Sequence, residues 1–125
     1  MNDQMQALAR RAVACKHWRW MPGMVTTNGY VVVDVKNGYA LARSTDDRHT
    51  FFDIGLKFFP DLTDPATLGC LLALVREAWN DPSLCANDAG AYDLMFWHVY
   101  TGDKFVSVGC QTEVEALVAA LEAAP

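Results

Sequence analysis

The spacing of apolar and polar residues along the chain predicts helices near both ends and in the middle, with β-strands between them. Near the start, apolar side chains recur every three or four residues, which predicts an amphipathic helix from Asp3 to about Cys15. Its apolar face consists of Met5, Leu8, Ala9, Ala12 and Val13. Basic residues near its end complement the helix dipole, which is a structural reason for their sign.

Two Asn-Gly pairs, at 28–29 and 37–38, each lie between runs of β-forming residues. Asn-Gly tolerates the positive φ angles of a type I′ turn, so both pairs predict tight hairpins. We therefore expect a three-stranded antiparallel meander formed by Met24–Thr27, Tyr30–Lys36 and Tyr39–Arg43. The segment His49–Asp53 is a candidate for a further short strand.

A two-residue turn at 37–38 determines how the last two strands of this meander pair. It places Val35 opposite Ala40 and Val33 opposite Ala42. Val31, Val33 and Val35 then share a face with these alanines, and helices can cover that face. The other face is more polar and is expected to be wetter; it carries Tyr30, Val32, Asp34, Tyr39, Leu41 and Arg43.

The clearest predicted element is a helix that opens at Asp64-Pro65. Asp64 is a good N-cap, and a helix tolerates proline at its first position. Apolar residues follow at helical spacing and predict a narrow buried stripe of Leu68, Leu71, Leu72, Val75 and Trp79. The run Asn80-Asp81-Pro82 is expected to end the helix and to open a surface loop from Asn80 to Gly90.

The last third of the chain predicts two strands and a closing helix. The strands are Tyr92–Tyr100 and Lys104–Val108. Thr112 and Glu115 have the spacing of a capping box, and the helix that follows has an apolar stripe of Val114, Leu117, Val118 and Leu121. The order is α-β-β-β-α-β-β-α. We therefore expect one α+β domain, residues 1–125, with three helices packed on an antiparallel sheet made of the meander and the later hairpin.

Composition agrees with a small globular domain. The 125 residues are 52% hydrophobic and 20% charged, which suits a packed core and argues against disorder. No apolar run approaches the roughly 20 residues that span a bilayer, and the N-terminus lacks the pattern of a secretory signal. We therefore expect no membrane partner and a cytoplasmic location. Four cysteines permit three disulfide pairings, but in the cytoplasm we expect free, mostly buried thiols at Cys15, Cys70, Cys85 and Cys110.

The net charge of -5 is unevenly distributed along the chain. Residues 1–20 carry four Lys and Arg against one Asp, whereas residues 61–125 carry two Lys and Arg against ten Asp and Glu. The first segment suits an acidic or anionic partner, and the larger acidic part repels nucleic acid.

The N-terminal segment also interleaves cations with aromatic residues, and this set has two alternative interpretations. Its members are Arg10, Arg11, Lys16, Trp18, Arg19 and Trp20. Single-stranded nucleic acid binders stack bases on rings and neutralise phosphates with cations, so the set is a candidate binding patch. Alternatively, the two indoles fill the core where the first helix meets the first strand, with Pro22-Gly23 as the turn. We favour the second interpretation because the patch has only four cations.

The chain has more large aromatic residues than one thin domain is expected to bury entirely. Candidate interface residues are Tyr39, Phe58, Phe59, Trp97 and Tyr100. Because no catalytic constellation accompanies them, we favour a non-enzymatic module that binds a protein partner or assembles with itself. A single-stranded nucleic-acid-binding module is the alternative, and an enzyme with an unrecognised pocket holding Cys or His is the third hypothesis.

No residue pattern predicts a catalytic centre, a cofactor or a metal. His49 lies near Asp46, Asp47 and Asp53, but one imidazole falls short of a typical set of three or four ligands. Cys15 and His17 are neighbours in sequence without a third orienting residue. The glycines are scattered among turns, so there is no phosphate-binding loop.

The helix–three strands–helix order of residues 1–80 also matches a double-stranded RNA-binding domain. Such domains meet phosphates with lysines at the start of their last helix, where this chain has Asp61 and Asp64. The acidic helix start argues against that function.

Three segments resemble small uncharacterised phage and prophage proteins of the α-β-α sandwich type. They are Trp18-Arg19-Trp20-Met21-Pro22-Gly23-Met24, the segment from Pro60 to Leu72, and the tail from Glu115 to Leu121. The resemblance implies no activity and no site residues. It implies a context, the accessory proteins of bacterial viruses, which often bind host or defence machinery.

Overall fold

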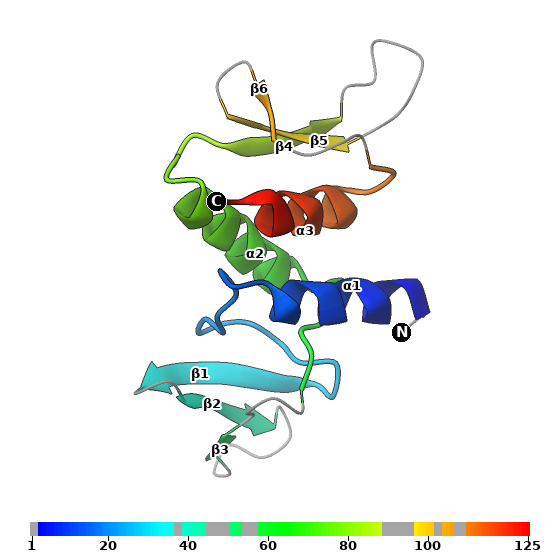
Figure 1. The fold of residues 1–125 in the computed structure, drawn as a ribbon. Coiled ribbons are helices and arrows are strands. Elements are labelled where there is room, and N and C mark those ends of the chain that lie inside the picture. Colours follow the sequence, from blue (N-terminus) through cyan, green and yellow to red (C-terminus); the bar gives the residue numbers. More distant parts are fainter. Residues whose placement is uncertain are drawn as a thin grey trace. The chain divides into compact units, whose positions relative to one another are not determined.

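The computed structural model describes residues 3–36, 39–44, 51–53, 58–88, 97–101, 104–106 and 110–125. These residues form three α-helices and two three-stranded antiparallel sheets (Figure 1). The elements in chain order are α1 (Asp3–Ala14), β1 (Tyr30–Lys36), β2 (Tyr39–Ser44), β3 (Phe51–Asp53), α2 (Pro65–Ala78), β4 (Cys85–Asp88), β5 (Trp97–Thr101), β6 (Lys104–Phe105) and α3 (Glu113–Ala123). The expected α+β class with three helices is confirmed, and the strands are divided between two sheets instead of forming one.

The chain divides into two compact units, each made of two separate segments. Unit 1 comprises Met1–Val13 and Arg19–Cys70, and unit 2 comprises Ala14–Trp18 and Leu71–Pro125. The sheet β1-β2-β3 belongs to unit 1, and the sheet β4-β5-β6 belongs to unit 2 with α3. The single domain expected from the sequence stays a prediction.

In unit 1, a β-bulge interrupts the antiparallel pairing of β1 with β2. Val35 lies opposite Ala40 as predicted, but Val32 lies opposite Ala42 where Val33 was expected. Val33 is therefore the extra residue of the bulge. Because one inserted residue reverses the alternation of side chains, Val32 is only 1% exposed, although the sequence placed it on the wetter face.

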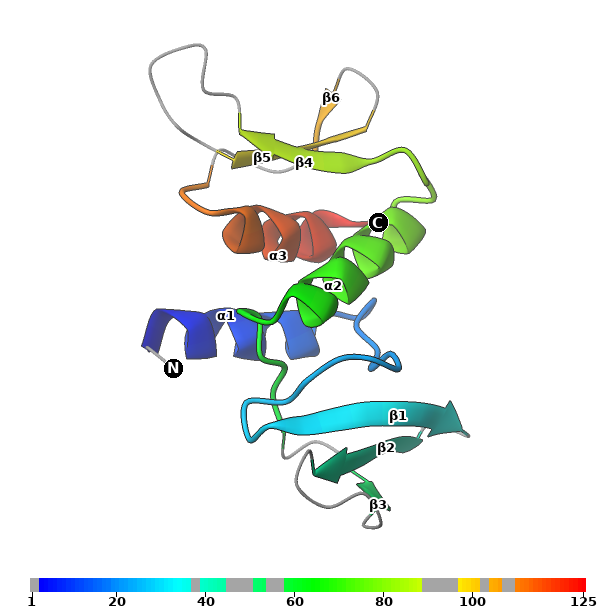
Figure 2. The ribbon, with the colours of Figure 1, turned by 180° about the vertical axis from the view of Figure 1, so that it is seen from behind.

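The segment Met24–Thr27, expected as the first strand of the meander, forms isolated bridges instead. Val25 bridges to Val31 of β1, and Thr26 bridges to Pro60. In both views of the ribbon, residues 19–29 run between α1 and β1 (Figure 1 and Figure 2). The third strand of the sheet is β3, which pairs with β2 and lies within the candidate strand His49–Asp53.

Pro22-Gly23 forms the expected turn before this segment. The Met24 amide donates to the Met21 carbonyl over 3.1 Å, and Gly23 has a φ of 98°. Proline followed by a glycine with positive φ is the arrangement of a type II turn.

Asn28-Gly29 turns the chain into β1, although not through the predicted type I′ turn. The Thr26 amide donates to the Tyr30 carbonyl over 2.8 Å, and the Gly29 amide donates to the Thr26 carbonyl over 2.9 Å. Gly29 has a φ of 85°, and Asn28 is not in the positive-φ region. The loop is thus a three-residue one closed by a left-handed glycine. The other Asn-Gly pair, at 37–38, lies outside the described residues.

Helix α2 begins at Pro65 as predicted, and its N-cap also anchors the preceding segment of unit 1. Asp64 Oδ2 accepts hydrogen bonds from the Thr67 amide at 2.9 Å and from Thr67 Oγ1 at 3.0 Å. The same Thr67 hydroxyl oxygen accepts from the Val25 amide over 2.8 Å. Thr67 is fully buried, so this hydroxyl joins the start of α2 to the strand-like segment 24–27.

Helix α1 buries the face that the sequence predicts. Leu8, Ala9 and Ala12 are at most 4% exposed, whereas Met5 and Val13 at the margins of the stripe are half-buried. The positions one turn apart on the opposite face, Gln6 and Arg10, are exposed. This separation leaves the polar face of α1 available for a site.

In unit 2, β4 lies in the segment expected to be a surface loop. Cys85–Asp88 pairs antiparallel with β5, and β5 pairs with β6. On the edge of β5 opposite β4, the edge that β6 occupies, Trp97 forms a backbone pair with Cys110, with N···O distances of 2.6 and 3.0 Å. The predicted strand Tyr92–Tyr100 is described from Trp97 onward, since its earlier residues lie outside the described ones.

Helix α2 ends at Ala78, and Asn80, with a φ of 51°, adopts the left-handed conformation that terminates it. The Asp81 amide donates to the Arg76 carbonyl over 2.9 Å, and the Asn80 amide donates to the Glu77 carbonyl over 3.1 Å. These two bonds around a left-handed residue form a Schellman motif. The predicted end of the helix is therefore confirmed, with asparagine in the position that glycine usually takes.

The buried face of α2 is rotated relative to the predicted stripe. Leu71, Leu74 and Val75 are at most 1% exposed, whereas Leu68, Leu72 and Trp79 are half-buried. Trp79 Nε1 donates to the Ala120 carbonyl of α3 over 2.9 Å. The Trp79 indole therefore makes two kinds of contact within unit 2: its ring is partly buried, and its N–H donates a hydrogen bond to α3.

Helix α3 covers the second sheet, contacting β4 and β5. One of the two bonds of its predicted capping box is present, since the Glu115 amide donates to Thr112 Oγ1 over 3.2 Å. Glu115 Oε2 accepts from the amide of Gln111. The buried face includes the small residues Ala116 and Ala120 beside the predicted Leu117, Val118 and Leu121, whereas Val114 is half-buried.

Candidate functional site

A small hollow on unit 1 is lined by Gln6, Arg10, Thr27 and Phe59, with a cavity volume of about 160 Å³. Gln6 and Arg10 come from the exposed polar face of α1. Thr27 lies in the loop before β1, and Phe59 lies in the segment before α2. The hollow therefore joins three segments that are distant in the sequence.

Backbone pairing positions the two walls that do not come from α1. The Thr27 amide donates to the Phe59 carbonyl over 2.9 Å, and the adjacent residues Thr26 and Pro60 form a β-bridge. Nearby, the Asp61 amide donates to the Val25 carbonyl over 2.8 Å. These bonds hold the loop and the pre-helix segment side by side.

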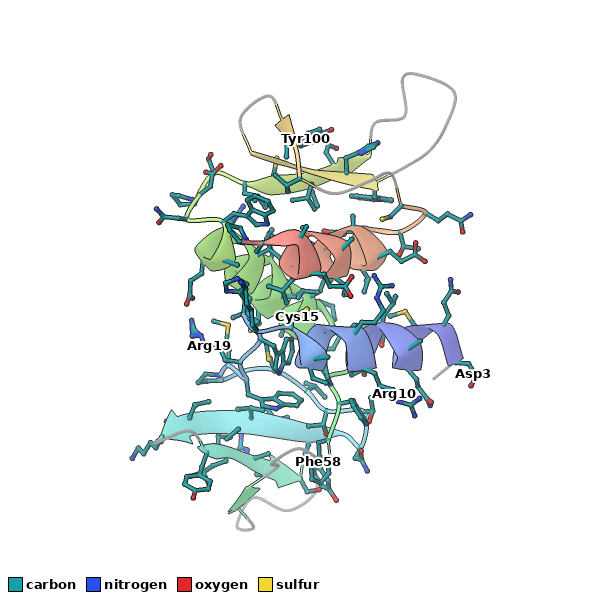
Figure 3. All side chains as sticks on the ribbon, viewed as in Figure 1. Asp3, Arg10, Cys15, Arg19, Phe58 and Tyr100 are labelled. Atoms are coloured by element: carbon teal, nitrogen blue, oxygen red, sulfur yellow. The ribbon has the colours of Figure 1, made fainter. Side chains whose placement is uncertain are left out.

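The Arg10 guanidinium lies over the ring of Phe59. Its Cζ atom is 5.7 Å from the ring centroid, within the range of a cation–π interaction. Arg10 is exposed and Phe59 is half-buried. Figure 3 shows Arg10 extending from α1 on the side of the segment that carries Phe58. The site thus combines a positive charge with an aromatic surface.

The two residues of this contact belong to different sets of predicted site residues. Arg10 belongs to the predicted basic and aromatic patch, and Phe59 belongs to the predicted interface aromatics. Gln6 and Thr27 belong to neither predicted set, although the sequence places Gln6 one helical turn from Arg10. Nothing in the sequence indicates that Thr27 lies beside Phe59.

The other members of the predicted patch are divided between the two units. Arg11, Arg19 and Trp20 belong to unit 1, and Lys16 and Trp18 belong to unit 2. All four cations of the set, Arg10 included, are exposed, whereas both indoles are half-buried. The Trp18 ring nitrogen is itself buried. The structure therefore assigns one patch member, Arg10, to the hollow.

The other predicted interface aromatics differ in exposure. Tyr39 is 59% exposed, whereas Phe58, Trp97 and Tyr100 are half-buried. The Phe58 ring meets the Tyr30 ring edge-to-face, with centroids 5.6 Å apart and planes at 77°. Phe58 is thereby used in packing within unit 1.

The two units differ in net charge. Unit 1 contains seven Lys and Arg and seven Asp and Glu, whereas unit 2 contains three and eight. Unit 1 is therefore neutral by formal count, and unit 2 carries the whole net charge of -5. A polyanion such as nucleic acid gains no attraction from the overall charge of either unit.

All four cysteines are free, as expected, but they are less buried than predicted. Cys85 is exposed and the other three are half-buried. Burial raises the pKa of the Cys70 thiol, and the nearby Asp64 carboxylate raises it further. Cys70 Sγ is 4.0 Å from the Pro22 carbonyl oxygen. Both effects on the pKa disfavour the thiolate, the opposite of what a nucleophilic cysteine requires.

The histidines offer no assembled centre in the part of the chain that can be described. His17 Nε2 is 2.8 Å from the Pro125 carbonyl oxygen, and His98 lies half-buried on β5. The metal site considered from the sequence includes His49, Asp46 and Asp47, which lie outside the described residues. Among the described residues, no three His, Cys, Asp or Glu side chains are grouped to hold a metal ion.

None of the helices in the described ranges has the length and apolar character to cross a membrane. Comparison of the chain with protein-family models, with curated proteins and with solved structures gave no match.

Proposed function

We propose that this chain is a non-enzymatic protein-interaction module whose binding face lies on unit 1, around the hollow of Gln6, Arg10, Thr27 and Phe59. The supporting observation is the exposed Arg10 held over Phe59 at the edge of this hollow. Arginine and aromatic residues are enriched at the centres of protein interfaces, where they account for much of the binding energy.

The size of the hollow favours a protein partner over a small molecule. Ligand and cofactor pockets usually enclose about 300–1,000 Å³. A volume of about 160 Å³ is closer to the space that one inserted side chain fills. The hollow is therefore suited to an anchor residue of a partner.

The proposed setting is the cytoplasm of a bacterial cell, with the chain acting as a phage or prophage accessory protein. Free thiols at all four cysteines agree with a reducing compartment. The phage origin rests on the resemblance of the segments 18–24, 60–72 and 115–121. Accessory proteins of bacterial viruses often act by binding host or defence machinery.

Nucleic acid is the weaker candidate partner. The exposure of Arg10, Arg11, Lys16 and Arg19 favours it. Tight binding to a strand, however, needs several phosphate contacts, and the predicted patch is divided between a neutral and an acidic unit. Salt-dependent quenching of tryptophan fluorescence by a dT10 oligonucleotide, abolished in Trp20→Leu, would reverse this order of preference.

Site-specific photo-crosslinking tests the proposal. A benzophenone amino acid at Gln6, beside the hollow, is compared with the same group at Ala73, an exposed position of α2 in unit 2. In a lysate of the source organism, we expect discrete protein adducts from position 6 only. Light scattering on the purified chain reports self-association. A strict monomer that gives the same diffuse adducts from both positions would refute the proposal.

A further inference from the structure

The two side chains that α1 contributes to the hollow on unit 1 have unused hydrogen-bonding capacity. A guanidinium carries five N–H donors and no acceptor, and a glutamine amide carries two donors and one acceptor. Within the described residues, neither the Arg10 guanidinium nor the Gln6 amide has a hydrogen-bond or ion-pair partner; the recorded contact of Arg10 is with the Phe59 ring. The site is therefore rich in donors.

The carboxylates nearest in sequence to Arg10 and to Phe59 do not pair with the Arg10 guanidinium. Asp3 precedes Arg10 by seven residues, which is about 10 Å along a helix. Asp61, two residues after Phe59, accepts hydrogen bonds at Oδ1 from the amide and hydroxyl of Thr63. Neither offers Arg10 an internal counter-ion in the described geometry.

The contact with the Phe59 ring favours binding of a carboxylate by the Arg10 guanidinium. A guanidinium that lies over an aromatic face keeps its N–H donors directed outward in its own plane. This plane matches the two oxygens of a carboxylate, which arginine binds through a pair of parallel hydrogen bonds. The contact with Phe59 also restricts the long side chain, so that less conformational entropy is lost on binding.

We propose that the hollow binds the side-chain carboxylate of an aspartate or glutamate in an acidic segment of a protein partner. Arg10 pairs with the two oxygens, Gln6 donates to one of them, and the carbon stem of the acidic residue lies against the Phe59 ring. This inference rests on the proposed interaction function. A peptide carboxylate is favoured over a nucleic acid phosphate because, among the residues that the structure describes, the lining of the hollow presents one cation on a neutral unit.

The test uses two blocked peptides, Ac-Ala-Leu-Glu-Leu-Ala-NH2 and the same sequence with glutamine in place of glutamate. Each is titrated into the ¹⁵N-labelled chain and followed by NMR at the Arg10 Nε–H, the Gln6 side-chain amide and the Thr27 backbone amide. We expect saturable shifts with the glutamate peptide and about tenfold weaker binding of the glutamine peptide, because the charge-assisted pair is lost. Spectra away from the hollow should not change.

Variants of two neighbouring arginines separate the site from overall charge. Arg10→Ala and Arg11→Ala remove the same charge from adjacent exposed positions of α1. We expect Arg10→Ala to lose the preference for the glutamate peptide and Arg11→Ala to retain it. Phe59→Leu, which keeps an apolar side chain without the ring, should weaken binding by about threefold.

Three results would overturn the acidic-segment inference: equal binding of both peptides, equal losses in the two arginine variants, or the same shifts at lower concentration from a dT10 oligonucleotide. If crosslinking at Gln6 identifies a protein whose binding is unaffected by Arg10→Ala, the interaction function stands and the carboxylate inference fails. If the glutamate peptide binds through Arg10 and crosslinking yields no partner, the interaction function fails while the chemistry of the site is upheld.

Discussion

Replacement of Thr67 by valine isolates the hydrogen bonds that join the start of α2 to the segment before β1. Valine has nearly the same shape and a similar helix propensity, so the substitution removes the hydroxyl group and little else. It breaks the bond from the Val25 amide to Oγ1, of 2.8 Å, and the bond from Oγ1 to the Asp64 carboxylate, of 3.0 Å.

The expected cost follows from these two bonds. A neutral hydrogen bond contributes about 1 kcal/mol and one to a charged group at least about 1.5 kcal/mol. The added methyl group of valine returns about 0.8 kcal/mol through burial, since Thr67 is fully buried. The Val25 amide also loses its partner in a partly buried position, which adds to the loss. The free energy of unfolding should fall by about 2–3 kcal/mol.

Urea unfolding followed by tryptophan fluorescence measures this change, and hydrogen exchange at the Val25 amide should become faster. Thr63→Val is the matched control, because the Thr63 hydroxyl also donates to an aspartate, Asp61, but is exposed. We expect the control to change stability by less than about 0.5 kcal/mol. Equal costs for the two variants, or unchanged exchange at Val25, would refute the assignment of Thr67 as the anchor.

Further predictions concern two glycines and two thiols. Gly23→Ala should destabilise the fold by about 1–2 kcal/mol, because Gly23 has a φ of 98°. Gly69→Ala should stabilise the fold by about 0.5–1 kcal/mol, because Gly69 lies in α2 with free space around it. Thermal unfolding of the two variants should therefore shift in opposite directions. Iodoacetamide at pH 8 should alkylate exposed Cys85 before Cys70. Burial, aided by Asp64, raises the pKa of Cys70 above its ordinary 9.0, so the unfolded chain loses this proton first and stability should fall as pH rises above about 9. A Cys70→Ala variant that keeps the same pH dependence would contradict this.

The site was only partly predictable from the sequence. Arg10 and Phe59 were both singled out, one as a member of a basic patch and the other as an unburied aromatic residue. Their contact depends on the pairing of Thr27 with Phe59 across more than thirty intervening residues. Because such pairings have no local signal, the sequence could not indicate that these residues line one hollow.

The pairing of the β-strands was also only partly predictable from the sequence. The predicted register of β1 and β2 holds for the three pairs from Lys36 to Asp34 and then fails, because Val33 forms a bulge that no residue type near it indicates. Strand β4 was interpreted as a loop, since Cys85–Asp88 lacks β-branched residues and gains its conformation by pairing with β5.

The sequence by itself determined where α2 begins and ends and where α3 begins. Asp64 and Thr112 cap these two helices, and Asn80 closes α2, since these groups satisfy backbone atoms within a few residues of themselves. Only the tertiary structure decided the division into two sheets, the face of α2 that is buried, and the placement of Arg10 over Phe59. These features depend on contacts between distant segments, where packing and strand pairing outweigh local preference.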